Sequence, residues 1–196
     1  MDSAEQIREA ATHLFATRGY DGASLQAIAE RVGVTKQTLL YHYPSKDVLR
    51  RAVLGGIFAH FGERLPKMLE AVTSGHGRFE ALPRELFDFF SQHGDAARVL
   101  MRELLDNPEQ MQRLLADHLR PWVLLVAQYI REGQRIDLIY EDVDPEAYVL
   151  NVILLVLANV VTRPLMGGVV STDSAGAQDK QLRELFRLTR VGLFKR

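Results

Sequence analysis

The stretch FATRGYDGASLQAIAERVGVTKQTLLYHYPSKDVL, residues 15–49, contains two short helical patterns on either side of Gly33. Apolar residues recur at three- and four-residue spacing before the glycine, and an apolar and aromatic cluster follows it. The second pattern starts with four polar residues, 35–38, for which a purely structural helix has no use. The stretch therefore predicts a helix–turn–helix unit whose second helix begins with outward, polar side chains.

The residues around the turn have the chemistry that such a unit needs. Ser24 is a favoured helix N-cap, and Gly33 permits the backbone conformation of a tight turn. In this motif the first residues of the second helix meet base edges in the major groove. Gln can bond adenine, Lys can reach guanine acceptors, and Thr can contact a thymine methyl. The candidates for base contacts are Thr35, Lys36, Gln37, Thr38 and Tyr41.

Charge supports the same segment. The formal net charge of the chain is −1, which argues against a general nucleic-acid coat. Residues 31–51, however, hold Arg31, Lys36, Lys46, Arg50 and Arg51 against Asp47 alone. A solvated helix face would explain the charge equally well. If the segment binds DNA, hydroxyl, imidazole, ammonium and free backbone amide groups suit phosphate contacts. The candidates are Ser24, His42, Ser45 and Lys46.

The same 35 residues resemble the DNA-binding domain of the tetracycline-repressor (TetR) family of bacterial transcription regulators. The resemblance is carried by Phe15, Gly19-Tyr20, Ser24, Ile28-Ala29, Gly33-Val34, Lys36, Leu39, Tyr41-His42-Tyr43, Lys46 and Leu49. One departure is Leu40, where the family often has a tyrosine that touches the phosphate backbone. Either Tyr41 or Tyr43 makes that contact, or it is missing.

The resemblance implies the organisation of the whole chain. The family folds as all-helical homodimers of about nine helices per subunit, with a ligand pocket behind the DNA-binding head. We therefore expect an all-α fold, with a three-helix DNA-binding domain at residues 1–47 and a helical ligand-binding and dimerisation domain at 48–196. The expected partners are double-stranded DNA, a second copy of the chain, and a small apolar or amphipathic ligand. The predicted function is a repressor released from a palindromic operator by that ligand.

Two helices of the second half suit a twofold interface. The segment 148–161 is apolar nearly all round and must be buried on most sides, and the last helix is amphipathic. The interface candidates are Tyr148, Val152, Leu155, Val156, Leu182, Leu185 and Phe186. Asn151 and Asn159 would bond across the dimer, within the core or to a ligand. Core packing without a dimer is the alternative.

Aromatic residues of the expected domain at 48–196 could line an apolar pocket, although each could be ordinary core. The ligand-pocket candidates are Phe61, Phe89, Phe90, His93, Trp122 and Asn159.

Several functions lack the residues that they need. The chain has no cysteine, and its six histidines form neither an i, i+4 pair nor HExxH. We expect no metal, no cofactor, no catalytic residue and no enzymatic activity. The charged N-terminus lacks a signal-peptide pattern, and the run 148–161 is short for a bilayer, so we expect a cytoplasmic protein without a membrane partner. The alternative function is a helical ligand-binding or scaffold protein whose DNA-binding unit has lapsed.

Prolines and glycines set the expected helix ends. Ser3 and Gln6 form a capping-box pair for a helix that ends at Gly19. One helix should start at Pro108 and kink at Pro121, and another should start at Pro145 and stop at Pro164. A loop over 166–177 and a final helix over 178–195 complete the prediction.

Overall fold

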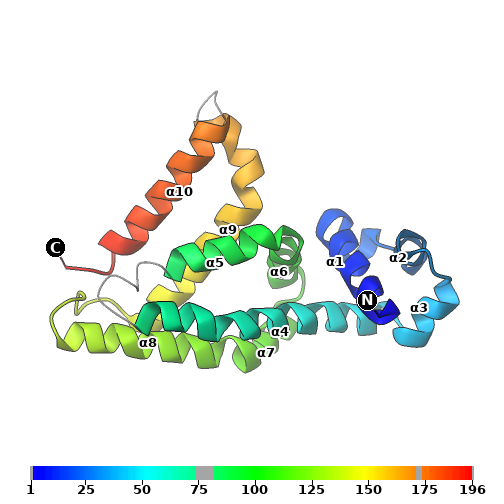
Figure 1. Ribbon diagram of the computed structural model, residues 1–196, viewed down its shortest axis with the longest axis horizontal. Coiled ribbons are helices and arrows are strands. Elements are labelled where there is room, and N and C mark those ends of the chain that lie inside the picture. Colours follow the sequence, from blue (N-terminus) through cyan, green and yellow to red (C-terminus); the bar gives the residue numbers. More distant parts are fainter. Residues whose placement is uncertain (1, 74–81, 171–173, 196) are drawn as a thin grey trace. The chain divides into compact units, whose positions relative to one another are not determined.

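A computed structural model describes residues 2–73, 82–170 and 174–195, and these residues form ten α-helices (Figure 1). An isolated antiparallel bridge joins Ile139 and Phe194. The predicted all-α class is confirmed. The helices are α1 (Ser3–Gly22), α2 (Leu25–Val32), α3 (Lys36–His42), α4 (Lys46–Thr73), α5 (Leu82–Gln92), α6 (Gly94–Asp106), α7 (Pro108–His118), α8 (Arg120–Arg135), α9 (Pro145–Val170) and α10 (Ser174–Val191).

The chain forms two compact units. The first comprises Met1–Glu63 together with His93–Pro108, and the second comprises Arg64–Gln92 together with Glu109–Arg196. The expected domain boundary at residue 47 falls at the start of α4, whereas α4 continues in the first unit to residue 63 and α6 joins that unit. α6 belongs there because it packs against α1, which sequence periodicity does not reveal.

The core of the first unit is built from the apolar stripes of short helices. Ile7 and Leu14 of α1, Ile28 of α2, Leu39 of α3 and Leu49 of α4 are almost fully buried. α1 packs against α2, α3 and α6. Because each helix contributes few residues to this core, α3 is held by its single buried Leu39 and by the chain on either side of it.

A buried ion pair joins α4 to α6 within the first unit. The Nε atom of Arg50 donates to both carboxylate oxygens of Glu103, at 2.9 and 3.0 Å, and its Nη2 atom donates to the same carboxylate. Both side chains are about nine-tenths buried. Asn107, at the end of α6, adds a hydrogen bond from its amide to Glu103 at 3.3 Å. Opposite charges thus compensate each other where neither is well hydrated.

The second unit is organised around α9, which packs against α5, α8 and α10. Val126 and Ile130 of α8 and Val156 of α9 are fully buried, and Leu185 of α10 is nearly so. The other side of α9 is exposed and apolar. Its most exposed leucines and valine are Leu150, Leu154, Leu155, Leu165 and Val169.

The length argument against a membrane span was wrong. Pro145–Met166, 22 residues of α9, is long and apolar enough to cross a bilayer by length and composition alone, and only 33% of its most apolar window is buried. The apolar run continues past Val161 because the helix does. A subunit interface also needs a long apolar helix. The composition of the described residues therefore fits a membrane span and a subunit interface equally well.

Several helix ends differ from the sequence prediction. Asp2 precedes α1 without a side-chain cap, so the Ser3 capping box is wrong, and α1 continues past a non-helical Gly19 (φ 77°, ψ 171°) to Gly22. The expected kink at Pro121 is instead a full break, because α7 ends at His118 and α8 begins at Arg120. α9 passes through Pro164, and α10 starts at Ser174, within the predicted loop.

Candidate nucleic-acid interface

The turn between α2 and α3 is fixed by local hydrogen bonds. The Ser24 hydroxyl accepts from the Ala27 amide at 3.0 Å, which caps α2 as the sequence predicts. Gly33 ends α2 with a left-handed backbone (φ 79°, ψ 26°), and its amide donates to Glu30. The amide of Val34 then donates to the carbonyl of Ala29 at 3.0 Å. Paired amide bonds of this kind at a left-handed glycine terminate a helix sharply.

The start of α3 is capped in the same way. The Thr35 hydroxyl accepts from the Thr38 amide at 3.1 Å and lies 2.9 Å from the Thr38 hydroxyl. The predicted helix start at Thr35 is therefore confirmed. Leu39 is fully buried and fixes the rotation of the helix. Lys36 and Gln37, in contrast, are exposed, and Gln37 lies on the side of the helix away from Leu39.

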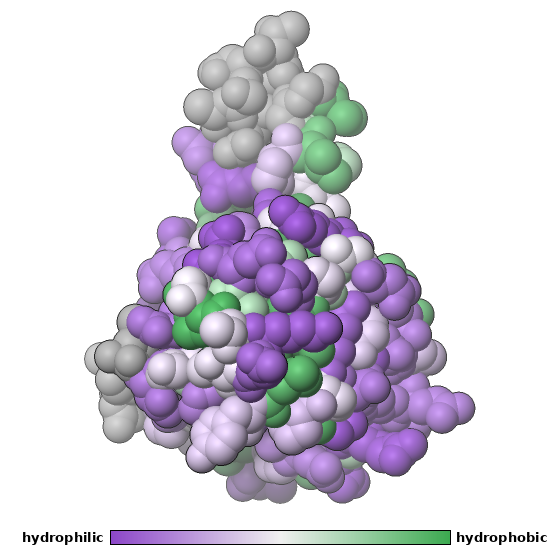
Figure 2. Space-filling view, turned by 90° about the vertical axis from the view of Figure 1, so that its right-hand side faces the viewer, coloured by the Kyte–Doolittle hydropathy of each residue, from purple (hydrophilic) through white to green (hydrophobic). Residues whose placement is uncertain are grey.

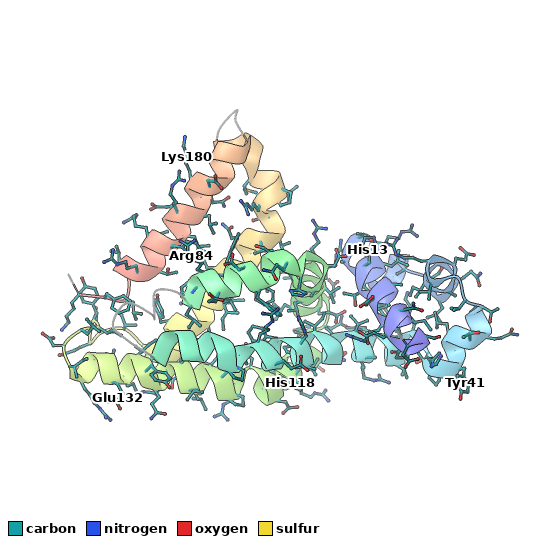
Figure 3. The ribbon with its side chains drawn as sticks, in the orientation of Figure 1. His13, Tyr41, Arg84, His118, Glu132 and Lys180 are labelled. Atoms are coloured by element: carbon teal, nitrogen blue, oxygen red, sulfur yellow. The ribbon has the colours of Figure 1, made fainter. Side chains whose placement is uncertain are left out.

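Three of the five candidates for base contacts are fully available to a partner. Lys36, Gln37 and Tyr41 are exposed, with Tyr41 at 84%. Figure 3 labels Tyr41, which points away from the ribbon of α3. Thr35 is exposed as well, but its hydroxyl caps the helix, and Thr38 is half-buried with its hydroxyl against Thr35. Lys36, Gln37 and Tyr41 are therefore the side chains with the most freedom to meet a base edge.

The residues predicted to contact phosphates also make contacts within the protein. Ser45 accepts from the amide of Val48 at 3.2 Å and so caps α4. The Lys46 ammonium lies 4.3 Å from the centre of the Tyr20 ring and 3.5 Å from the carbonyl of Asp21. His42 is half-buried and meets the Tyr41 ring edge-on at 5.3 Å. Ser24, Ser45 and Lys46 each lie at or beside the first residue of a helix, where free amides favour anions.

Tyr20 contacts several residues at the start of α4, a role that was not predicted from the sequence. Its hydroxyl donates to Asp47 at 2.7 Å, and both Lys46 and Arg50 lie over its ring. Burial, and then the Asp47 carboxylate, raise the pKa of Tyr20 to about 12. The Gly19-Tyr20 pair is part of the resemblance described above, and its aromatic ring is the sequence signal that points to this role. Tyr20 thus ties the end of α1 to the start of α4.

Of the two tyrosines that could replace the missing one at position 40, only Tyr41 is exposed. The Tyr43 hydroxyl donates to the carbonyl of Ala4 at 3.1 Å, and burial raises its pKa. Tyr43 therefore holds α3 against α1. Figure 2 views the side on which α3 lies and shows a surface that is mostly hydrophilic around small apolar areas.

The sequence matches two family models along most of its length. The bacterial regulatory proteins of the tetR family match residues 7–53, and the tetracyclin repressor-like C-terminal domain matches residues 77–188. The chain belongs to the TetR family. The TetR-family match covers the residues that build α2, its turn and α3, so the recognised family and the observed geometry describe the same helix–turn–helix.

Curated relatives of this TetR-family chain are named as transcriptional regulators. It is 32% identical over 95 residues to the HTH-type transcriptional activator FasR of Mycolicibacterium smegmatis, covering 48% of this chain and 43% of FasR. It is 27% identical over 122 residues to the negative transcriptional regulator of the biofilm operon, IcaR, of Staphylococcus epidermidis, covering 59% of this chain and 66% of IcaR. The chain thus spans 43% of the length of FasR and 66% of the length of IcaR.

Solved structures share the fold of this TetR-family chain. The ketosteroid transcriptional regulator KstR2 of Mycobacterium tuberculosis matches with a TM-score of 0.74 and 16% identity, over 100% of this chain and 96% of that one. Reduced NemR of E. coli matches with a TM-score of 0.70 and 19% identity, over 98% and 97%.

The predicted ligand-pocket residues fall in both compact units, so a shared pocket stays a prediction. Phe61 and His93 lie in the first unit, where the Nε2 atoms of His93 and His60 are 3.2 Å apart. The other four candidates lie in the second unit, and all four are buried. Trp122 borders a void of about 10 Å³, room for about one water molecule. The four are Phe89, Phe90, Trp122 and Asn159.

The predicted interface residues divide by exposure. Leu155 is exposed, at 43%. Tyr148 is half-buried and its hydroxyl donates to the carbonyl of Thr189 at 2.5 Å. Leu182 and Phe186 are half-buried, whereas Val152, Val156 and Leu185 are buried inside their own chain. Leu150 and Leu154 are exposed interface candidates that helical periodicity alone did not single out.

Proposed function

We propose that this protein is a homodimeric transcription regulator that binds operator DNA through α3. The observation that carries the proposal is the start of α3, where Lys36 and Gln37 project from a helix that is capped by Thr35 and anchored by the buried Leu39. A rigid helix with exposed hydrogen-bonding side chains at its N-terminal end suits the major groove. Contacts to the phosphates come from Ser24, His42, Ser45 and Lys46, and Tyr41 reaches either a base edge or the backbone.

Pairing of two chains would determine the spacing of the two half-sites in the operator. In a twofold dimer the two α3 helices would read half-sites about 34–36 Å apart. The exposed leucines of α9 support pairing, because an apolar face of this length is disfavoured in water. We keep the prediction that the protein represses its target and leaves the operator when a small molecule binds the second unit. In that event the void beside Trp122 has to widen.

The proposed experiment distinguishes recognition of bases from electrostatic attraction to DNA of any sequence. A mobility shift is measured on DNA that flanks the protein's own gene and on a scrambled duplex of equal length. Lys36→Ala and Gln37→Ala should each lower the preference for the operator by about 5- to 150-fold, because a bidentate base contact contributes about 1–3 kcal/mol of discrimination. Lys180→Ala is the matched control, since Lys180 is an exposed lysine of α10 in the second unit.

Lys46→Ala should weaken binding to both duplexes similarly, because a phosphate contact carries no sequence information. Unchanged discrimination in both Lys36→Ala and Gln37→Ala would show that α3 does not read the bases. Equal weakening by Lys180→Ala would point to net charge instead.

A further inference from the structure

The second unit contains a hollow that the DNA-binding function does not use. It lies between the first turn of α5, the start of α9 and the C-terminal half of α10, and its volume is about 560 Å³. Figure 3 labels Arg84, which lies between α5 and α10. The volume falls in the range of small-molecule sites in proteins. The hollow adjoins the small void beside Trp122, because Pro83 and Tyr148 line both, but Trp122 itself does not line the hollow.

The polar wall of this hollow is made of arginines. Arg183, Arg187 and Arg190 recur at four- and three-residue spacing and therefore share one face of α10, and Arg84 joins them from α5. No carboxylate is among the described residues that line the hollow. Four guanidinium groups around one concavity create a positive potential that attracts anions.

The arginines differ in how far the protein already satisfies them. Arg187 donates to both carboxylate oxygens of Glu184, at 2.8 and 2.6 Å. Arg84 lies 4.6 Å above the Phe186 ring. Its guanidinium group forms no ion pair with a carboxylate of a described residue. Arg183 is exposed and forms no ion pair with a described residue. Arg84 and Arg183 therefore have donors to offer to a ligand.

The remaining wall is apolar and aromatic. Phe186 is held edge-on by Phe87, with ring centres 6.2 Å apart, and is covered by Arg84. The Tyr148 hydroxyl already donates a hydrogen bond to the carbonyl of Thr189. Phe194 and Leu193 contribute more apolar surface. The hollow thus offers hydrophobic contact next to fixed positive charge.

We infer that this hollow binds a small anionic molecule that joins a phosphate or carboxylate group to a flat ring. Guanidinium groups are planar and bind such oxyanions through paired hydrogen bonds. Leu193 and Phe194 provide the apolar surface for the ring, and the concave shape favours a small molecule over an extended chain. The inference does not rest on DNA binding, because every lining residue lies in the second unit.

Calorimetry with the full-length protein tests the site, with 1-naphthyl phosphate as the probe. Inorganic phosphate supplies the charge alone, and 1-naphthol supplies the ring alone. The naphthyl phosphate should bind at least about 10-fold more tightly than either, because it uses both walls. Arg183→Gln and Arg84→Gln should each weaken its binding by about 5- to 10-fold, the loss of a charge-assisted hydrogen bond at a partly hydrated site.

The matched control is Arg135→Gln, an exposed arginine of α8 that pairs with Glu132 on its own helix. Its binding should equal that of the unchanged protein. Three results would overturn the inference: no binding of 1-naphthyl phosphate at millimolar concentration, equal affinity for inorganic phosphate, or equal weakening by Arg135→Gln.

Discussion

Gly33 decides whether α3 can leave α2 in the observed direction. Its backbone is left-handed, with φ at +79°. A Cβ atom placed there would meet nothing within 4 Å, so space around the residue is not the constraint. The backbone conformation itself disfavours any L side chain, at a cost of about 1–2 kcal/mol. Gly33 is therefore required for its φ angle, and its replacement measures strain without a steric clash.

Gly33→Ala should lower the free energy of unfolding by about 1 kcal/mol, measured by urea denaturation. Gly55→Ala is the matched control, because a Cβ at this helical position of α4 also meets nothing within 4 Å. The control should stabilise the protein by about 0.5–1 kcal/mol, since alanine favours a helix over glycine. Equal effects of the two substitutions on the free energy of unfolding would contradict the conclusion that Gly33 is required for its positive φ angle.

Tyr20 gives the protein a sensitivity to alkaline pH. Its pKa is raised to about 12, so the folded protein binds a proton that the unfolded chain releases near pH 10. The stabilisation is complete below about pH 10 and is lost as the pH rises towards 12. Tyr20→Phe should therefore show a smaller fall in unfolding free energy between about pH 9 and 11 than the unchanged protein. An identical fall would mean that other groups cause it.

The sequence revealed which side chains are polar at the interface, but not which are already engaged. The caps at Ser24, Thr35 and Ser45 each depend on an amide three residues later, and the predicted cap at Ser24 is confirmed. Lys46, in contrast, lies over Tyr20, 26 positions earlier in the sequence. Contacts of that separation leave no periodic signal, and for this reason the role of Tyr20 was not predicted.

At the scale of helices, proline was a less reliable guide than apolar periodicity. α9 continues through Pro164 to Val170, because its apolar residues continue on both sides of the proline. The break between α7 and α8 falls at Leu119, two residues before Pro121, which then occupies the first turn of α8. The place of α6 beside α1 depends on pairs such as His13 with Asp95, 2.8 Å apart, which the sequence pattern does not reveal.

The α4–α6 contact depends on the buried pair of Arg50 and Glu103. Glu103→Gln should lower the unfolding free energy by about 3–5 kcal/mol, because it leaves the Arg50 charge buried without its counter-ion. The double variant Arg50→Met/Glu103→Leu should lose much less stability than Arg50→Met and Glu103→Leu added together. Urea denaturation of these three variants and of the unchanged protein measures the coupling.

Glu132→Gln provides the control for that experiment. Its partner Arg135 is 72% exposed, so the pair should contribute less than about 1 kcal/mol. A loss from Glu103→Gln as small as that from Glu132→Gln would show that the buried pair does not hold α6 to α4.

At the scale of the whole molecule, the exposed face of α9 is the main feature without an explanation inside one chain. Leu150 and Leu154 are four residues apart and therefore neighbours on one face, 42% and 50% exposed. The Arg-lined hollow does not include either leucine. Tyr148 and Phe186, however, line the hollow and are also interface candidates, so a second chain and a small anion would bind to adjoining surfaces.

Leu154→Arg should shift the protein from dimer to monomer in sedimentation at micromolar concentration, because a charge would have to be buried against the apolar face of the other chain. Operator affinity should fall at least about 10-fold with it, since a monomer holds one half-site only. The matched control is Leu105→Arg, at a 78% exposed leucine of α6 in the first unit, which should leave the protein dimeric. A wild-type protein that sediments as a monomer, or a control that dissociates equally, would remove α9 as the interface and with it the paired reading of an operator.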